Sequence, residues 1–324
     1  MKKIIVLGAT GSIGKSTLDV VSNYPEKLEI VGMSAHKNGD KLAELGLKYN
    51  CNNLTLTGCE NSKNNTINFY GPTQLLDMIK NSGADIVVNG IAGSSGLLPS
   101  VTTIESGIDL ALANKETMVM AGGIINNLVK EFNVKLLPVD SEHSAIFHLL
   151  ENCEPDDIDE VILTASGGAF RELPIDKLKD VTLKDALTHP TWDMGAKITI
   201  DSASMANKGL EVIEAAQLFN LPADKIKVLI HPQSYVHSLI RKKDLSMYAQ
   251  ISAPDMKLPI QNALFYPRME RVESTFLDLT GKSLTFTEPD YQKYPMLELA
   301  YKTLELGPKY YVAYNAANEV CITN

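Results

Sequence analysis

A strand, a glycine-rich turn and a helix follow one another within residues 4–21, and this order constrains the fold more than any other feature. Residues 4–7 are apolar, residues 8–14 are GATGSIG, and residues 15–21 have helical periodicity. The glycines permit a tight turn and let backbone N–H groups approach a pyrophosphate at the start of the helix. A plain turn between a strand and a helix is the alternative. The G-x-x-G-x-x-G spacing predicts a Rossmann-type parallel sheet that binds a dinucleotide.

The end of the next predicted strand indicates which dinucleotide binds. An NAD-binding domain places an acidic side chain there, on the ribose 2′-hydroxyl. Here the strand at 28–33 is followed by Ser34 and Ala35 and then by His36, Lys37 and Asn38. A lysine beside a histidine suits a 2′-phosphate, so we expect NADPH rather than NADH. The alternative is that Lys37 is an ordinary solvated cation.

Two carboxylates follow the apolar run at 134–139. Asp140 and Glu142 flank Ser141, and in an extended backbone side chains two residues apart point to the same side. Two anions held this close repel each other unless they share a proton or a cation. A divalent metal with oxygen ligands is one solution, and splayed, solvated charges are the other.

A lysine also lies at the carboxyl end of a predicted strand, where ligands of such sheets bind. Lys115 follows the strand at 109–112 and stands between Asn114 and Glu116. A lysine there could neutralise a developing oxyanion. It could equally be a structural partner of Glu116.

Polar residues also end the predicted elements of the second half. Ser166 and two glycines end the strand at 160–165, where backbone N–H groups can reach an anion. The segment 189–195 holds the single tryptophan between turn-forming residues; a lone tryptophan is usually core, and a mobile lid over a ligand is the competing interpretation. Residues 197–200 are predicted to form a strand, with Ser202 as the N-cap of the helix that follows.

That following helix places three polar side chains close together. Asn207 and Glu211 are four residues apart and share one face, which Lys208 borders. Gly209 costs about 1 kcal/mol inside a helix, so we expect a close backbone approach or a kink. An ordinary surface helix could carry the same residues.

Length and charge limit the architecture and the partners. With 324 residues the chain is too long for one ordinary core. We expect an α/β fold: an N-terminal Rossmann-type parallel sheet over 1–140, a central α+β catalytic domain with a mixed sheet over 141–274, a linker at 275–295 and the start of a C-terminal helical domain at 296–324. A net charge of −9 argues against nucleic acid or an anionic membrane as the main partner.

Cysteine spacing and hydropathy indicate the compartment. The four cysteines form no C-x-x-C pair, and neither a signal peptide nor a membrane span is evident, so we expect the cytoplasm. Predicted strands at 228–230, 235–240 and 246–252 form a mixed sheet whose exposed face could pair two subunits, which predicts a homodimer.

Taken together, the motifs resemble the 1-deoxy-D-xylulose 5-phosphate reductoisomerase family. They run in order along the whole chain: GATGSIG at 8–14, ANKE at 113–116, DSEHS at 140–144, SGGAFR at 166–171, HPTWDMG at 189–195, DS at 201–202, NKGLE at 207–211 and HPQS at 231–234. The resemblance implies that a small phosphorylated sugar is rearranged and then reduced by NADPH, with Mg²⁺ or Mn²⁺ bound. It also implies a loop, here 189–195, that closes over the site.

The resemblance further implies roles for individual residues. The metal ligands would be Asp140, Glu142 and Glu211, and the catalytic residues Lys115, Glu142 and His189. The substrate would be bound by Lys115, Ser141, Glu142, Ser166, His189, Ser202, Asn207, Lys208 and Glu211. NADPH would be bound by Thr10, Gly11, Ser12, Ile13, His36, Lys37, Asn38, Asn114, Glu116 and Gly195.

The chain departs from the family pattern at two points, and two competing functions are open. The position of His36 is often glycine in relatives, and the family normally continues past Asn324 into a C-terminal helical domain, so this chain is expected to be a C-terminally shortened form. A metal-free NADP aldehyde or semialdehyde dehydrogenase would need a nucleophilic cysteine in a motif-like turn. A non-catalytic NADP-binding sensor would bind NADPH without any metal-dependent turnover.

Overall fold

The computed structural model describes residues 1–60, 66–151, 153–192, 194–271 and 276–323, which form two compact units. The first unit comprises Met1–Thr117, Gly123–Asp140 and Met256–Ser274. The second comprises Met118–Gly122, Ser141–Asp255 and Thr275–Asn324. Within the described residues no helix is long and apolar enough to cross a membrane.

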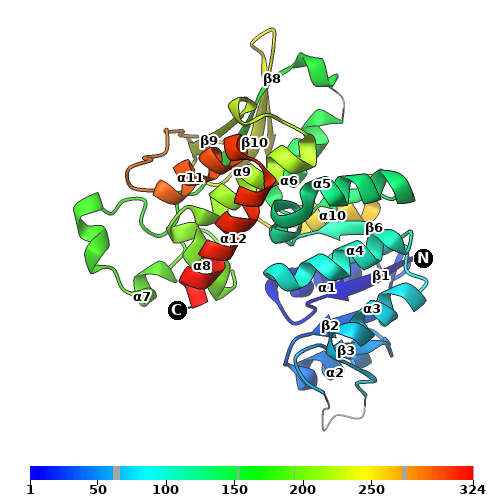
Figure 1. Ribbon diagram of the computed structural model, residues 1–324. Coiled ribbons are helices and arrows are strands. Elements are labelled where there is room, and N and C mark those ends of the chain that lie inside the picture. The colour runs from blue at the N-terminus through cyan, green and yellow to red at the C-terminus, as the bar shows by residue number, and fades with distance from the viewer. Residues whose placement is uncertain (61–65, 152, 193, 272–275, 324) are drawn as a thin grey trace. The chain divides into compact units, whose positions relative to one another are not determined.

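The first unit is built on a seven-stranded parallel sheet with the order β4-β3-β2-β1-β5-β6-β7 (Figure 1). The strands are added on one side of β1 up to β4 and then on its other side from β5, so the strand order reverses between β1 and β5, as in dinucleotide-binding sheets. The parallel Rossmann-type sheet predicted from the glycine turn is therefore confirmed. Its strands are β1 (Lys2–Leu7), β2 (Leu28–Ala35), β3 (Leu54–Leu56), β4 (Phe69–Tyr70), β5 (Ile86–Asn89), β6 (Asp109–Leu112) and β7 (Leu136–Pro138).

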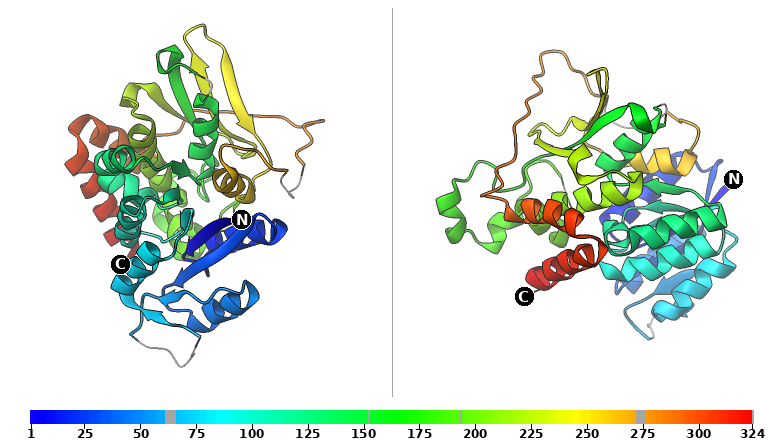
Figure 2. Two further views of the ribbon diagram at one scale, coloured as in Figure 1. Left: turned by 90° about the vertical axis from the view of Figure 1, so that its right-hand side faces the viewer. Right: turned by 45° about the horizontal axis from the view of Figure 1, so that its top comes forward.

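Helices lie on both faces of this sheet (Figures 1 and 2). One pair of neighbours is α1 with α10, and another is α3 with α4. Residues 4–7 of β1 and all of β5 are buried, as expected of central parallel strands covered on both sides. The helices are α1 (Ser12–Asn23), α2 (Gly39–Lys48), α3 (Gly71–Asn81), α4 (Leu97–Glu105), α5 (Lys115–Phe132) and α10 (Lys257–Phe265).

Two glycines explain why the turn between β1 and α1 can be so tight. Gly8 has φ +75°, and a Cβ there would lie 2.9 Å from the carbonyl oxygen of Gly90. A Cβ on Gly14 would lie 2.4 Å from the carbonyl oxygen of Gly8. Only glycine allows α1 to pack this closely on the turn, so the tight turn predicted from these glycines is confirmed.

The second unit holds a mixed four-stranded sheet with the order β11-β10-β8-β9. Strands β8 and β9 are parallel, whereas β10 runs antiparallel to both β8 and β11. The mixed sheet predicted for the central part of the chain is confirmed. Its strands are β8 (Ile158–Ala165), β9 (Ile226–Ile230), β10 (Val236–Lys242) and β11 (Met247–Ile251).

Helices α6 and α9 pack on this sheet, and α11 and α12 pack against α9 (Figure 1). The resulting core joins residues far apart in sequence, such as Leu163, Val212 and Leu297, each completely buried. Helices α11 and α12 therefore help to hold α9 in place. The helices of this unit are α6 (Ser141–Leu150), α7 (Leu183–Ala186), α8 (Ala196–Ala203), α9 (Ala206–Phe219), α11 (Pro295–Leu306) and α12 (Pro308–Thr323).

Two local predictions were wrong. Residues 197–200, expected to form a strand, lie in α8, where Lys197 pairs with Asp201 at 3.0 Å across one helical turn. Ser202 is inside α8 and is not an N-cap; the N-cap of α9 is Met205, with φ +61°. The alternation Lys-Ile-Thr-Ile has the period of a strand, but the ion pair is possible only at helical spacing.

The backbone after β7 is also not extended as expected, because α6 begins directly at Ser141. Glu142 therefore lies in the first turn of a helix, and its position relative to Asp140 does not follow the rule for extended strands.

The unit boundaries differ from the sequence-based division at two segments, the first being Met118–Gly122, which lies within the predicted domain 1–140 but clusters with the second unit. A boundary after Asp140 is present in both, but Met256–Ser274, assigned by sequence to the catalytic domain, clusters with the first unit. The expected junction between 274 and 275 lies outside the described residues. The polar stretch after it pairs with the sheet through a bridge between Ile230 and Thr287.

Gly209 provides the first testable prediction. The hydroxyl of Tyr314 on α12 would lie 2.2 Å from a Cβ at this position, so the glycine permits a close approach, one of the two expected explanations. Gly209→Ala should lower the free energy of unfolding by about 2 kcal/mol, because overpacking outweighs the gain in helix propensity. Urea denaturation measures the change, and Tyr314→Phe in the same chain should recover part of it. An alanine variant as stable as the wild type would contradict the packing argument.

Candidate active site

The turn between β1 and α1 presents backbone N–H groups at the start of a helix. Thr10 lies in the turn, Gly11 is the N-cap of α1, and Ser12 and Ile13 begin its first turn. Glycine at the N-cap has no side-chain oxygen to accept from these N–H groups, which leaves them to an anion. The residues present therefore fit the pyrophosphate of a dinucleotide.

The three residues after β2 are all exposed. The Nδ1 atom of His36 lies 3.3 Å from the hydroxyl of Thr57. Asn38 caps α2 by accepting from the backbone N–H of Lys41 at 3.2 Å. Its role as a helix cap is sufficient to explain why Asn38 stands at this position. The exposed side chains of His36 and Lys37 present hydrogen-bond donors at the end of β2.

Asn114 organises the Gly/Ser loop that follows β5. Its side-chain amide donates to the carbonyls of Ile91 at 2.7 Å and Gly93 at 2.9 Å, and to Glu116 at 3.0 Å. Its oxygen accepts from the N–H of Thr117 at the start of α5. Asn114 and Glu116 are both buried, so this pair fixes the loop shape at the carboxyl end of the sheet.

Lys115 pairs with Asp140 rather than standing alone. Its ammonium lies 2.8 Å from the Asp140 carboxylate, and the two side chains are 7% and 15% exposed. Lys115 begins α5 and Asp140 follows β7, so neighbouring strands β6 and β7 bring the pair together. The carboxylate at the end of this sheet is therefore held by a nearly buried cation.

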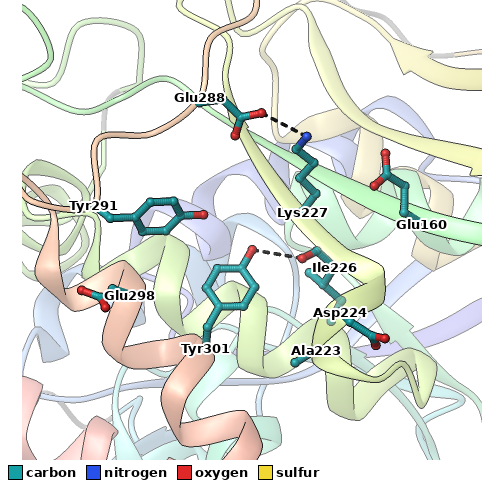
Figure 3. A pocket seen from close by; sticks show the side chains of 9 residues that line it. All are labelled: Glu160, Ala223, Asp224, Ile226, Lys227, Glu288, Tyr291, Glu298 and Tyr301. Carbon is teal, nitrogen blue, oxygen red and sulfur yellow. Dashed lines mark hydrogen bonds and ion pairs between the residues drawn. The ribbon is translucent and has the colours of Figure 1, made fainter.

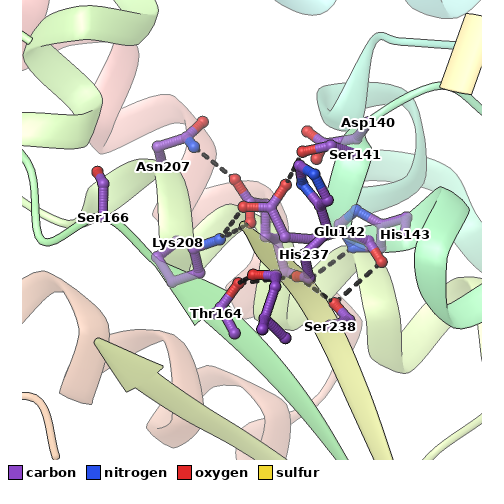
Figure 4. Close-up of polar contacts among 12 residues, drawn as sticks. Asp140, Ser141, Glu142, His143, Thr164, Ser166, Asn207, Lys208, His237 and Ser238 are labelled. Atoms are coloured by element: carbon purple, nitrogen blue, oxygen red, sulfur yellow. Dashed lines mark hydrogen bonds and ion pairs between the residues drawn. The ribbon is translucent and has the colours of Figure 1, made fainter. Parts of the chain in front are cut away.

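In the second unit, Lys208 joins two acids that are distant in sequence (Figure 4). Its ammonium lies 2.6 Å from Glu142 and also contacts Glu211. Asn207 donates to the other oxygen of Glu211 at 2.5 Å, which confirms their predicted shared face. Burial alone would lower the pKa of Lys208, but the two carboxylates outweigh it and raise the pKa, so the lysine is a cation here.

The side chains of this cluster are of the kind that could hold a divalent metal. Carboxylate oxygens of Glu142 and Glu211 lie within 4.8 Å of each other, and Glu211 is 2% exposed. Two largely buried carboxylates already share one cation, and carboxylates are the ligands that Mg²⁺ and Mn²⁺ prefer. The donor set therefore fits such an ion, with Lys208 standing where positive charge is required.

Two serines hold Glu142 in place. Ser141 donates to its carboxylate at 2.5 Å, and the hydroxyl of the buried Ser238 lies 3.1 Å from its backbone carbonyl and 2.7 Å from that of His237, and is a donor to either. Ser238 lies on β10, which is the support of α6. Sequence reasoning missed Ser238, although it follows the HPQS motif on a predicted strand.

A second buried acid lies one turn further along α9. Glu214 is 2% exposed and lies 3.6 Å from Nδ1 of His143, whose Nε2 is 3.0 Å from the backbone carbonyl of Glu211. This pair offers an alternative set of metal-binding side chains. The two acids on α9 are distinguished by their partners, an ammonium for Glu211 and an imidazole for Glu214.

Ser166 and His189 form a further pair in this unit. Backbone N–H groups of Thr191 and Trp192 donate to Nδ1 of His189, so its Nε2 carries the hydrogen and donates to Ser166 at 3.0 Å. Burial, aided by Arg171, lowers the pKa of His189 to about 4. The imidazole is therefore neutral near pH 7.

The environment of Ser166 favours an anion. Its oxygen accepts from His189 and from the N–H of Gly168 at 3.2 Å, so its own hydrogen is left to donate elsewhere. Gly168 has φ +66°, and a Cβ there would lie 2.3 Å from the carbonyl oxygen of Ser202. The glycine loop thus brings Ser166 and Ser202 into the same neighbourhood.

Sequence reasoning also missed His237, which lies on β10 and is 6% exposed. Its ring is 6.4 Å from that of Trp192. The pKa of His237 is lowered to about 4, mainly by burial; hydrogen bonds with the backbone of Ser252 and Ala253 act to raise it, and the charge of Lys208 acts to lower it. His237 is therefore a neutral, buried side chain beside the cation of the site.

The low pKa of His237 predicts an acid-labile fold. Its folded pKa of about 4 lies below the unfolded value of 6.5, so the stabilisation is complete above pH 6.5 and is lost as the pH falls toward 4. The loss is on the order of 3 kcal/mol. His237→Gln should flatten the dependence of the urea midpoint on pH between 6.5 and 4.5. The exposed His36→Gln serves as the control, and an unchanged slope in His237→Gln would contradict the prediction.

Gly195 lies in a different unit from the other predicted cofactor residues, which are all in the first unit. It is exposed and lies in the second unit as the N-cap of α8. Its role in NADPH binding stays a prediction, as does that of the 189–195 segment as a lid.

A separate cavity of about 460 Å³ lies beside β9 and α11 (Figure 3). Four acids line it, but three already pair: Glu160 with Arg241, Glu288 with Lys227 and Glu298 with Lys302. The hydroxyl of Tyr301 donates to the carbonyl of Ile226. This cavity therefore shows no convergent set of available catalytic groups.

Two of the four cysteines lack the setting of a thiol nucleophile. Burial raises the pKa of Cys51 to about 11, so it is not a thiolate near pH 7. Cys153 is a weak donor to the carbonyl of Leu149. Neither has the activated setting that a cysteine-dependent aldehyde dehydrogenase requires.

The fold and the site define a class: a dinucleotide-binding chain with a second, mixed-sheet unit that carries a buried, cation-neutralised acidic cluster. Comparison with known proteins refines this class. Three family models match: 1-deoxy-D-xylulose 5-phosphate reductoisomerase at 4–122, its C-terminal domain at 136–219, and the DXP reductoisomerase C-terminal domain at 251–324.

The similar proteins carry the same name. The 1-deoxy-D-xylulose 5-phosphate reductoisomerase of Rippkaea orientalis is 45% identical over 99% of this chain and 84% of its own length, and that of Geotalea uraniireducens is 47% identical over 99% and 86%. A solved DOX-P reductoisomerase in complex with NADPH, fosmidomycin and magnesium is 36% identical, with a TM-score of 0.95 over 100% of this chain and 84% of that one. The Zymomonas mobilis enzyme in complex with NADPH is also 36% identical, with a TM-score of 0.90 over 99% and 85%. The chain belongs to the 1-deoxy-D-xylulose 5-phosphate reductoisomerase family.

Proposed function

We propose that this chain converts 1-deoxy-D-xylulose 5-phosphate to 2-C-methyl-D-erythritol 4-phosphate in non-mevalonate isoprenoid biosynthesis. The reaction rearranges the carbon skeleton and reduces the resulting aldehyde. The observation that carries the proposal is the cluster of Glu142, Lys208 and Glu211, because it joins a buried pair of carboxylates to a cation in a chain with a dinucleotide-binding sheet.

The metal would be held by Glu142 and Glu211 together with Asp140, and would be Mg²⁺ or Mn²⁺. The fit of the donors supports the first two ligands. Asp140 directly precedes Ser141 in the chain, and its carboxylate is kept at the end of β7 by Lys115. A divalent ion bound there polarises a carbonyl and stabilises negative charge on oxygen.

The phosphate of the substrate would be bound by Ser166, Ser202, Asn207 and Lys208. The available hydrogen of Ser166 and the close approach of the Gly168 loop to Ser202 support this assignment. Lys208, once its carboxylates are neutralised, is the cation that meets the anion. His189 keeps Ser166 oriented by donating from Nε2, and as a neutral ring it adds no charge of its own.

The carbon–oxygen backbone of the substrate would contact Lys115, Ser141 and Glu142. Lys115 supplies a positive charge that can oppose a developing oxyanion. NADPH, bound at the glycine turn and at the exposed His36 and Lys37, supplies the hydride. Closure of the 189–195 segment would exclude water from the reacting groups.

The proposal is tested by mixing the chain with NADPH, Mn²⁺ and 1-deoxy-D-xylulose 5-phosphate and following the absorbance of NADPH. We expect substrate-dependent consumption that stops on addition of EDTA. Consumption that EDTA leaves unchanged, or NADPH that binds while its absorbance stays constant with substrate and metal present, would contradict the proposal. Binding of NADPH without its consumption is the result expected of a non-catalytic NADP-binding sensor.

A homodimer would form through the edge of the mixed sheet. Strand β11 is at that edge and exposes Met247, Tyr248 and Ile251, between 39% and 50% each. An edge strand with apolar side chains is suited to pairing with a second copy. Tyr248→Glu should shift the mass measured by light scattering from dimer to monomer.

The reaction would take place in the cytoplasm. Four free thiols are consistent with that reducing compartment.

A further inference from the structure

Asp201 carries a buried charge immediately before Ser202. Its carboxylate is 2% exposed, and a carboxylate so buried needs donors for its oxygens. Lys197 donates to one oxygen at 3.0 Å from within α8. Asn318, which lies on α12 and is 5% exposed, donates to the other oxygen at 2.7 Å.

The segment after Asp201 is a tight corner. Helix α8 ends at Ala203, Met205 takes the left-handed conformation with φ +61°, and α9 begins at Ala206. A left-handed methionine is strained and persists only where its surroundings hold it. This corner separates Ser202 from Asn207 and Lys208, three of the four residues assigned to the phosphate.

Helix α12 holds the corner at a second point. The Tyr314 hydroxyl lies 3.3 Å from the carbonyl of Ala206 and 3.1 Å from that of Met296, and is a donor to either. Tyr314 and Asn318 are four residues apart, so they share one face of α12. One face of this helix therefore contacts the corner on both sides, at Asp201 and at Ala206.

We propose that Asn318 is a positioning residue for the phosphate site. Its amide fixes Asp201, and through it Ser202 and the first turn of α9, in the arrangement that binds a phosphate dianion. An amide suits this task because it donates to the buried carboxylate without adding charge next to an anion-binding segment. The inference rests on the proposed function, since it takes Ser202, Asn207 and Lys208 as the phosphate-binding residues.

The test uses Asn318→Asp, which keeps the side-chain shape but replaces the donor with an acceptor. Inorganic phosphate is the probe, titrated calorimetrically. We expect its Kd to rise about tenfold, the effect of losing one hydrogen bond to a charged group. The affinities for Mn²⁺, measured by electron paramagnetic resonance, and for NADPH, measured by fluorescence, should stay within about twofold of wild type, since the inference concerns only the phosphate-binding groups.

A double variant supplies the rescue. Asp201→Asn combined with Asn318→Asp restores one donor facing one carboxylate, with the direction reversed, and should bring the phosphate Kd back to within about threefold of wild type. Asn315→Asp is the matched control, because Asn315 is equally buried on the same helix and pairs with Glu319 instead. It should leave the phosphate Kd unchanged.

Three results would overturn the inference: an unchanged phosphate Kd in Asn318→Asp, equal losses for phosphate and Mn²⁺, or no recovery in the double variant. The first and third leave the proposed function intact, and the second indicates general loosening of the unit. If the wild-type chain itself fails to bind phosphate, the phosphate assignment and this inference fall together.

Discussion

Glu211→Gln is expected to weaken Mn²⁺ binding on the order of 100-fold while leaving NADPH binding within about twofold of wild type. The substitution removes the charge of a carboxylate that is 2% exposed and shares Lys208 with Glu142. The amide keeps one oxygen, which can accept from Asn207 or from Lys208, and the side chain keeps its size while the metal loses an anionic ligand. Electron paramagnetic resonance of free Mn²⁺ gives the metal affinity, and NADPH fluorescence gives the cofactor affinity.

Glu214→Gln is the matched control for that experiment. Glu214 is equally buried on the same helix, but its neighbour is His143 rather than an ammonium. We expect it to retain Mn²⁺ affinity. If Glu214→Gln loses Mn²⁺ and Glu211→Gln keeps it, the metal belongs with His143, and the cluster around Lys208 has another purpose.

Lys208→Met should weaken the binding of the anion without weakening the binding of the metal. Inorganic phosphate should bind about 30-fold more weakly, because a charge-assisted hydrogen bond of about 2 kcal/mol is lost. Mn²⁺ affinity should not fall, because the ammonium that competes for Glu142 and Glu211 is gone. Calorimetry gives the phosphate affinity and electron paramagnetic resonance gives the Mn²⁺ affinity of the same protein.

Thermal unfolding adds an independent measure of the same substitution. Removing the cation leaves two carboxylates facing each other with little exposure, which destabilises the metal-free chain. Mn²⁺ should therefore raise the melting temperature of Lys208→Met by more than it raises that of wild type. Lys227→Met, which breaks an exposed ion pair with Glu288, should behave as wild type. Parallel losses of phosphate and Mn²⁺ in Lys208→Met would argue that the lysine is only a structural anchor.

The parts of the fold that depend on local sequence were predictable. The glycine turn could be recognised because the positive φ of Gly8 and the close approach of Gly14 to the Gly8 carbonyl arise within the turn itself. The shared face of Asn207 and Glu211 followed from helical spacing alone. The parallel sheet then followed from the order of strands and helices.

What could not be predicted depends on contacts between distant segments. Lys208 could be placed beside Glu211 by spacing, but its contact with Glu142, 66 residues away, comes from the packing of α6 near α9. Residues 197–200 alternate as a strand does, and the contact of Asp201 with Asn318, 117 residues away, supports the helix that forms instead. His237 carries no local signal, because its low pKa is a consequence of burial.

The most direct test of the central claim is an anomalous-scattering map from a crystal of this chain grown with Mn²⁺. The account predicts one strong peak within coordination distance of carboxylate oxygens of Asp140, Glu142 and Glu211, with the Lys208 ammonium withdrawn from the two glutamates. A peak beside His143 and Glu214, or a peak elsewhere with Lys208 still bridging Glu142 and Glu211, would contradict it.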